Sequence, residues 1–548
     1  MIRIYTTTVR RDNGKSLSSL EILRILILKN TSKQKKDSRL MAKQDFNTQI
    51  TEGYHFKGDS IELGGAMLGG NVVSGLKVRI PLKTMNRHGL IAGATGSGKT
   101  KTLQVLAEQL AAKGTPVLLM DIKGDLSGIA AAGTLNKNIE ERHQKIGIGY
   151  EIGANTVEFL TLSDEQGARL RATVTEFGPV LFSKILGLND TQSSVVSVVF
   201  KYCDDNALPL LDLPDIKKVL NYFVNDGKDE LKAEYGNISP MTVGTILRKV
   251  IELEQQGAAV FFGERSFEVD DLCRLDDEGR GIISIVRLTD LQDRPKLFST
   301  FMLQMLAEIY ATFPEEGDLD QPKLCIFIDE AHLVFAEASK ALQSQIETVI
   351  KLIRSKGVGV YFCTQNPQDI PDAVLSQLGM KMQHALRAFT AKDRQNIRLV
   401  AQNYPLTDHY DVENLLTELG IGEAFVTVLN EKGIPTPLVQ TMLRAPQSRM
   451  DTLSDAEIAQ ILRGSKIADK YNEVIDRESA FELLTKKISG SGIAQAPQST
   501  GKKVAQEPTF VEKAMKNPMV KQVGTTIVRE LTRGLLGALG FGGKKKIW

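Results

Sequence analysis

Residues 93–100 fit the pattern G-x-x-x-x-G-K-T, with every position that defines a phosphate-binding loop filled. Glycines let the backbone wrap closely enough for successive N–H groups to point at phosphates, and the helix that follows adds the partial positive charge of its N-terminus. We expect Lys99 to reach the β- and γ-phosphates and the Thr100 hydroxyl to bind Mg²⁺. The sequence therefore predicts a nucleoside triphosphate site formed by Gly93, Ala94, Thr95, Gly96, Ser97, Gly98, Lys99 and Thr100.

Two carboxylates follow the apolar residues 324–328, which we expect to form a strand. Asp329, at the tip of that strand, is suited to hold Mg²⁺ through water, and Glu330 is suited to orient or deprotonate the water that attacks the γ-phosphate. The letters Asp-Glu-Ala-His, which end at His332, are also typical of a class of helicases. The paired glycine–arginine motif and the Ser-Ala-Thr motif of that class do not occur downstream. We therefore interpret His332 as a residue at the start of a helix.

A polar residue, Gln365, follows a third apolar segment at residues 358–363. At the tip of a strand between the phosphate loop and the acidic pair, a glutamine can bind the γ-phosphate or the attacking water. The alternative is a glutamine that caps a helix or lies in a loop. Small GTPases are disfavoured, because no Asn-Lys-x-Asp motif occurs and residues 136–139 depart from it at their last position.

The elements that must position these residues are indicated by the hydrophobic pattern between residues 85 and 445. Strand-like runs alternate there with helical periodicity, and an insertion at about 163–260 is mainly helical. Alternation of this kind predicts an α/β fold with a mostly parallel sheet that is covered on both faces. Residues 50–84 carry short alternating segments with many glycines, and we expect them to form a small β-module ahead of the core.

The two ends of the chain differ from its centre. Residues 1–40 contain ten Lys/Arg and three Asp/Glu, and we expect a disordered basic leader, or a true start at Met41, rather than a functional arm. Residues 446–487 are predicted to be a helical extension, and residues 488–510 a flexible linker rich in Ser, Gly, Ala, Gln and Pro. Residues 511–548 are amphipathic and basic. We expect them to dock on the protein itself or on a neighbouring subunit, and the alternative is an anionic membrane surface or a partner helix.

Charge and cysteine usage restrict the possible classes. The formal net charge is +2, and the basic first forty residues leave about −5 for the rest. The body is therefore not a generally basic nucleic-acid binder, and any DNA contact must be local. The four cysteines are far apart and form no C-x-x-C, which disfavours a disulfide framework or zinc site and favours reduced thiols in a cytoplasmic protein. No apolar run reaches the length of a membrane span.

Five segments taken together resemble the HerA-like branch of the HerA/FtsK ATPases, and more narrowly its bacterial YjgR-type group. The resemblance runs from about residue 50 to residue 485. It implies a RecA-like core, hydrolysis of ATP with Mg²⁺, and a homo-oligomeric ring, often hexameric, that moves along double-stranded DNA; a nuclease is a possible protein partner. The segments are Gly93–Thr100, Asp121–Asp125, Ile328–His332, Arg354–Gly359 and Thr364–Pro371.

The same resemblance assigns a role to an arginine. In the wider family, an arginine on the helix after the acidic pair reaches into the neighbouring subunit's site, and Arg354 is at the matching position. There it would stabilise the transition-state charge in trans. A surface arginine without that role is the alternative, and Arg387 is the competing candidate. The sequence thus favours an ATP-driven DNA translocase or helicase, with a nucleotide-gated scaffold or switch that assembles protein partners as the alternative.

Overall fold

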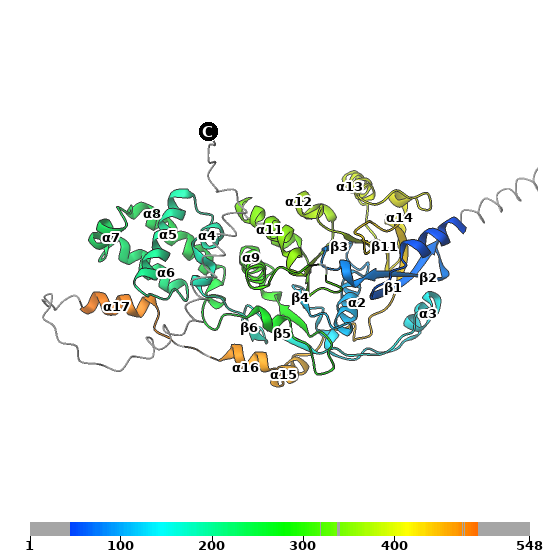
Figure 1. Ribbon diagram of the computed structural model, residues 1–548, viewed down its shortest axis with the longest axis horizontal. Helices are drawn as coiled ribbons and strands as arrows, with labels where there is room; N and C mark the ends of the chain where they lie inside the picture. The colour runs from blue at the N-terminus through cyan, green and yellow to red at the C-terminus, as the bar shows by residue number, and fades with distance from the viewer. Residues whose placement is uncertain (1–43, 318, 337–339, 474, 476, 491–548) are drawn as a thin grey trace, which may run out of the picture.

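A computed structural model describes residues 44–490 of the chain, except 318, 337–339, 474 and 476. Its centre is one sheet of twelve strands in the order β2-β1-β12-β11-β10-β3-β9-β8-β4-β7-β5-β6 (Figure 1). Neighbouring strands from β10 to β6 in that order run parallel, whereas β11, β12, β1 and β2 are joined to the edge of this parallel part by antiparallel pairs. The predicted α/β fold with a mostly parallel sheet is confirmed.

The strands are β1 (Ser60–Leu68), β2 (Asn71–Pro81), β3 (Gly89–Ala92), β4 (Val117–Asp121), β5 (Val157–Thr161), β6 (Ala168–Arg169), β7 (Ile283–Arg287), β8 (Leu324–Ile328), β9 (Val358–Thr364), β10 (Met380–Gln383), β11 (Glu423–Thr427) and β12 (Val439–Leu443). Residues 44–53 are also helical. The α-helices that follow are α2 (Lys99–Ala112), α3 (Lys137–Ile146), α4 (Val174–Ile185), α5 (Asp190–Asp205), α6 (Leu213–Val224), α7 (Lys228–Glu234), α8 (Pro240–Gln255), α9 (Pro295–Thr312), α10 (His332–Ala336), α11 (Lys340–Ile353), α12 (Asp372–Leu375), α13 (Ala391–Ala401), α14 (Val412–Glu418), α15 (Asp455–Arg463), α16 (Lys466–Asn472) and α17 (Ala480–Gly490).

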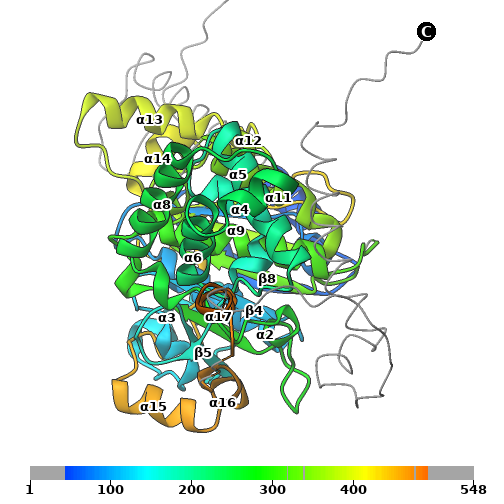
Figure 2. The same cartoon turned by 90° about the vertical axis from the view of Figure 1, so that its left-hand side faces the viewer.

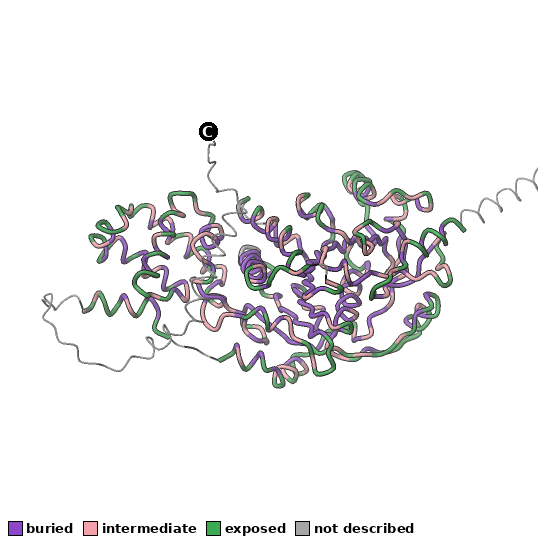
Figure 3. Tube along the Cα trace, in the orientation of Figure 1, coloured by how far each residue is buried: buried purple, intermediate pink, exposed green. Residues whose placement is uncertain are grey.

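Strand β4 shows how the sheet is covered on both faces. Successive side chains of a strand point to opposite faces, and Leu118 and Met120 belong to one hydrophobic cluster while Val117 and Leu119 belong to the other. Apolar residues of α9 and α11 complete the first cluster, and those of α2 complete the second. Buried residues are accordingly concentrated along the strands and along the helix faces that pack against them (Figure 3).

The first two strands extend the core sheet directly. β1 and β2 form an antiparallel pair, and β1 also pairs with β12, for example Gly64 opposite Leu443. A Cβ atom at Gly64 would lie 1.9 Å from the backbone oxygen of Met442, so that only glycine allows this close approach of the two backbones. The residues that precede the phosphate loop therefore belong to the same sheet as the loop.

Helices α4 to α8 lie between β6 and β7 in the chain and gather at one end of the long axis (Figure 1). Helices α13 and α14 lie on the opposite side of the molecule from α15 and α16 in both views (Figure 1 and Figure 2). Among the described residues, no helix has both the length and the apolar character needed to cross a membrane. The predicted basic leader and the amphipathic segment at 511–548 lie outside the described residues.

Candidate nucleotide-binding site

The phosphate loop connects β3 to α2, as its sequence predicts. Gly93, Gly96 and Gly98 have φ values of 153°, 76° and 110°, which side chains rarely allow. A Cβ atom at Gly93 would lie 2.5 Å from the Cβ of His384, and one at Gly98 would lie 3.2 Å from the backbone nitrogen of Gly422. The loop is thus held in its shape by close neighbours as well as by glycine backbone geometry.

Lys99 is buried at the first position of α2 and turns back over the loop. Its Nζ donates to the backbone oxygens of Gly93 and Ala94 at 2.6 and 3.2 Å. Burial lowers the pKa of this ammonium, and the nearby positive charge of Lys123 lowers it further. The predicted phosphate-binding lysine therefore lies directly over the loop, close to a second lysine.

The acidic pair lies two strands away from the phosphate loop, because β9 is placed between β3 and β8. Asp329 follows β8 and is buried, and burial raises the pKa of its carboxyl to about 6 despite the opposing charge of Lys123. Glu330 has a φ of 45° although it is not a glycine. Such left-handed backbone is uncommon outside glycine and is concentrated at functional sites.

Three side chains surround the Glu330 carboxylate. Lys123 forms a close ion pair with Oε1, Gln365 Nε2 lies 3.5 Å from the same oxygen, and His332 Nδ1 lies 3.2 Å from Oε2. Burial alone would raise the pKa of Glu330, but the hydrogen bond and the charge of Lys123 bring it below its usual value. His332 is the first residue of α10, as expected.

Gln365 connects the acidic pair to the phosphate loop. It follows β9, the strand between β3 and β8, so its position matches the prediction. Its Oε1 accepts from Thr95 Oγ1 at 3.5 Å, while its Nε2 faces Glu330. The Gln365 side chain can therefore contact the loop and the Glu330 carboxylate at the same time, or hold a water between them.

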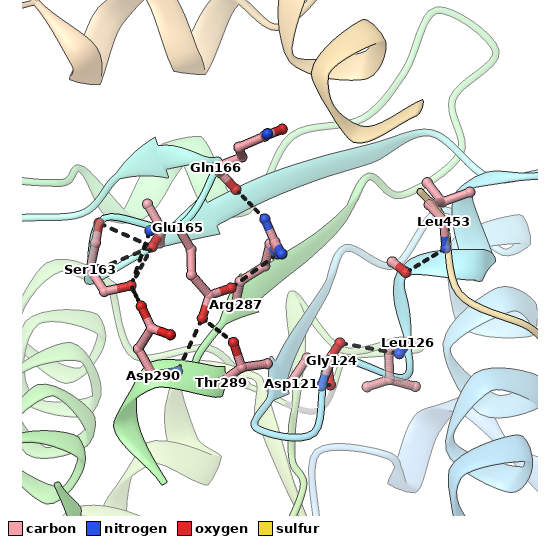
Figure 4. Close-up of polar contacts among 12 residues, drawn as sticks. Asp121, Gly124, Leu126, Ser163, Glu165, Gln166, Arg287, Thr289, Asp290 and Leu453 are labelled. Atoms are coloured by element: carbon pink, nitrogen blue, oxygen red, sulfur yellow. Dashed lines mark hydrogen bonds and ion pairs between the residues drawn. The ribbon is translucent and has the colours of Figure 1, made fainter. Parts of the chain in front are cut away.

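A turn after β4 contributes residues to which the sequence pattern assigned no role. The Asp121 carboxylate accepts from the backbone nitrogens of Gly124, Asp125 and Leu126 at 2.8, 3.2 and 3.1 Å, and Figure 4 shows the bonds from Gly124 and Leu126. Burial raises the pKa of Asp121 to about 7, and the neighbouring carboxylate of Asp125 contributes. The turn directs Lys123 to Glu330, and Asp125 Oδ2 accepts from Thr100 Oγ1 at 3.4 Å.

Two carboxylate oxygens at this edge of the sheet fit a magnesium ion. Asp329 Oδ2 and Asp125 Oδ1 are both buried, and neither has a hydrogen-bond partner in the described part of the chain. A buried carboxylate oxygen without a partner is costly, and a cation would satisfy it. No group of three His, Cys, Asp or Glu ligands occurs among the described residues. An ion held by few protein oxygens, with water and phosphate as the other ligands, is the arrangement that Mg²⁺ prefers.

The two candidate arginines lie at different edges of the sheet. Arg354 is exposed in the 3₁₀ turn η6 (Arg354–Lys356), before the start of β9, whereas Gln365 follows the end of that strand. Arg387 is exposed beyond the end of β10 and lines a hollow of about 500 Å³ together with Thr95 and Gln365. Within one subunit, the structure brings Arg387 to the rim of the phosphate loop and leaves Arg354 at the far edge.

Comparisons with known proteins find a matching family and several similar sequences. Residues 70–508 match the family model described as helicase HerA-like C-terminal. A "DNA double-strand break repair helicase HerA" from Sulfurisphaera tokodaii is 24% identical over 400 residues, which cover 71% of this chain and 69% of that protein. The protein of the same name from Sulfolobus acidocaldarius is 22% identical, with 68% and 67% covered. A "probable helicase" from Methanocaldococcus jannaschii is 23% identical, with 77% and 79% covered.

Solved structures with a similar chain trace include two bacterial proteins. The conjugative coupling protein TrwBdeltaN70 gives a TM-score of 0.47 at 13% identity, covering 74% of this chain and 94% of that chain. VirB4 of Thermoanaerobacter pseudethanolicus gives a TM-score of 0.46 at 15% identity, covering 71% and 97%.

Proposed function

This chain belongs to the HerA-like helicase C-terminal family, and from that premise we propose that it is a Mg²⁺-dependent ATPase that couples hydrolysis to movement along double-stranded DNA. The observation that carries the ATPase part is the convergence of five side chains at one edge of the sheet. They come from the ends of β3, β8 and β9, which are adjacent parallel strands, and from the start of α2: Lys99, Thr100, Asp329, Glu330 and Gln365.

Each side chain has a distinct task in this proposal. The Lys99 ammonium binds the β- and γ-phosphates over the loop, and Thr100 and Asp329 hold the metal through their oxygens. Bound Mg²⁺ would supply positive charge to the phosphate oxygens. Glu330 orients the attacking water and accepts its proton, and Gln365, between Thr95 and Glu330, keeps that water in line with the γ-phosphate.

The DNA part of the proposal rests on family membership. The relatives described above are named as helicases, and two of them are named as DNA double-strand break repair helicases. For this protein we propose duplex DNA as the substrate and a homo-oligomeric ring as the working form. The position of Arg354 supports a ring, because this arginine lies at the opposite edge of the sheet from its own phosphate loop and can complete only the site of a neighbour.

Stimulation by DNA is the test that separates a motor from a scaffold. The ATPase rate of the purified protein is measured with and without linear duplex DNA, and displacement of streptavidin from a biotinylated duplex end is followed in the same buffer. A motor should hydrolyse ATP faster on duplex DNA and displace streptavidin only when ATP is present. Glu330→Gln protein serves as the control for hydrolysis-dependent displacement. ATP hydrolysis that duplex DNA does not change, with no displacement, would contradict the DNA part and leave the ATPase part standing.

A further inference from the structure

The turn after β4 brings a second lysine to the acidic pair. β4 and β8 pair in parallel, with Met120 opposite Ile328, so the residues after both strands lie at the same edge of the sheet. Lys123 follows β4 by two positions and pairs closely with Glu330. We propose, resting on the ATPase function above, that Lys123 is a γ-phosphate-binding residue that exchanges the Glu330 carboxylate for the γ-phosphate when ATP binds.

The backbone that carries Lys123 is fixed on several sides. Asp121 accepts three backbone N–H bonds from the turn, and Gln292 Nε2 donates to the Ile122 oxygen at 2.8 Å. A Cβ atom at Gly124 would lie 2.9 Å from Thr289 Cγ2, and the φ of Gly124 is 75°. Because the backbone is held in this way, a change of partner by Lys123 requires motion of its side chain alone. That side chain is 36% exposed, which leaves it room to move.

The charges around Lys123 suit an anion. The positive charge of Lys123 acts on the ammonium of Lys99 and, after burial, lowers its pKa. Like charges at short range repel, and an anion between them removes the repulsion. The γ-phosphate of a nucleotide bound in the loop would be such an anion. Its oxygens accept strong charge-assisted hydrogen bonds from both ammonium groups.

The present partner of Lys123 explains why the exchange matters. Lys123 and Gln365 both face Oε1 of Glu330. The ammonium takes up one acceptor site of the carboxylate that the attacking water could otherwise use. Transfer of Lys123 to the γ-phosphate would open this oxygen only when a triphosphate is present. The lysine would thereby link recognition of the γ-phosphate to release of the carboxylate.

A purely structural lysine, one that only neutralises Glu330, gives a different expectation. It would not distinguish ATP from ADP, and its removal would free Glu330 and speed hydrolysis. A residue that binds the γ-phosphate contributes to ATP affinity but not to ADP affinity, and its removal slows turnover. A comparison of the affinities for ATP and ADP therefore distinguishes the two roles of Lys123.

The experiment uses the Glu330→Gln protein, in which ATP binding can be measured without turnover. Kd values for ATP and ADP with Mg²⁺ are measured with Lys123 intact and with Lys123→Met or Lys123→Gln added. We expect ATP affinity to fall about 10- to 100-fold, the range of one hydrogen bond to a charged group, and ADP affinity to change by less than about twofold on the same reasoning. Lys123→Arg should retain most of the ATP affinity, because it keeps the charge.

Lys137→Met is the matched control, because Lys137 forms a surface ion pair with Glu141 and its side chain is 87% exposed. In the background with intact Glu330, Lys123→Met should lower kcat at saturating ATP, with partial recovery in Lys123→Arg. Equal changes in ATP and ADP affinity, or a rise in kcat, would overturn the proposal while leaving the ATPase assignment intact. Failure of the Glu330→Gln protein itself to bind ATP would overturn both. Thermal unfolding of each variant identifies any loss that is due to misfolding.

Discussion

Replacing Arg354 by alanine tests whether the active site is shared between subunits. Arg354 precedes β9 and Gln365 follows it, so the seven residues of this strand separate them. At 3.3 Å per residue, the strand alone places roughly 20 Å between the arginine and its own γ-phosphate position. An arginine side chain cannot span that distance, and any direct contact must be with a neighbouring subunit.

The size of the loss in hydrolysis rate distinguishes a direct contact of Arg354 with the phosphoryl group from a long-range electrostatic interaction. At 20 Å and an effective dielectric constant of about 20, the interaction of two unit charges is below about 1 kcal/mol, which is no more than about a fivefold effect on rate. An arginine that contacts the transferring phosphoryl group in trans contributes about 10³–10⁵-fold to kcat. Arg354→Ala should therefore bind ATP normally and lose hydrolysis by about 10³-fold or more if the site is shared.

Mixing with the Lys99→Ala protein provides the assay. In randomly mixed rings, a complete site needs intact Lys99 in one subunit and intact Arg354 in the next, which is expected at about one interface in four. ATPase activity should then recover to about a quarter of the wild-type rate, if the sites act independently. Native mass measurements of differently tagged proteins confirm that subunits have exchanged before the rate is measured.

Arg387 gives the matched control. It lines the hollow beside Thr95 and Gln365 of its own subunit, so Arg387→Ala mixed with Lys99→Ala restores no complete site if Arg387 acts in cis. Recovery with Arg354→Ala and none with Arg387→Ala is the expected pair of results. Mixed oligomers without recovered activity in the Arg354→Ala mixture would refute the shared site, and recovery only in the Arg387→Ala mixture would exchange the roles of the two arginines.

Three further substitutions test the site within one subunit. Lys99→Ala removes the ammonium over the loop and should abolish ATP binding in a fluorescent-nucleotide titration; wild-type affinity would contradict the role of the loop. Glu330→Gln should bind ATP and turn over about 10²–10⁴-fold more slowly, and near-normal turnover would exclude it as the base. Asp329→Asn should weaken ATP binding with Mg²⁺ but not in EDTA, and equal losses would argue against the metal role. Because burial raises the pKa of Asp329 to about 6, lowering the pH from about 7 to about 5 protonates this carboxylate and should weaken Mg²⁺-dependent binding in the wild type, whereas this dependence should be smaller in Asp329→Asn.

Features set by short stretches of chain could be predicted from the sequence. The phosphate loop needs glycine at fixed spacing between a strand and a helix, and all three parts are contiguous. Asp329 and Gln365 could be placed because each follows an apolar strand directly, and Glu330 is the residue after Asp329. The ends of parallel strands meet at one edge of the sheet, so strand-end position is enough to bring these side chains together once the sheet is known to be parallel.

Features that depend on which strands are neighbours could not be predicted in the same way. The role of Lys123 follows from the pairing of β4 with β8, and those strands are about two hundred residues apart in the chain. The connection of β1 to β12 has the same origin, because it brings Gly64 beside Leu443. Local alternation predicts strands in residues 50–84, but it carries no information about a partner strand so distant in the chain.

The two arginines show how strand direction decides between a cis and a trans role. Both lie near strands that flank β3 directly, Arg354 before β9 and Arg387 after β10, and both strands run parallel to β3. In a parallel sheet, the start of one strand and the end of its neighbour lie at opposite edges. An arginine after a strand therefore shares the edge that carries its own phosphate loop, and an arginine before a strand faces whatever packs against the other edge. In a ring whose successive subunits meet head to tail, Arg354 completes a shared site only if that other edge faces the next subunit's phosphate loop. Strand direction thus keeps Arg354 away from the phosphate loop of its own subunit and brings Arg387 to the edge that carries the loop.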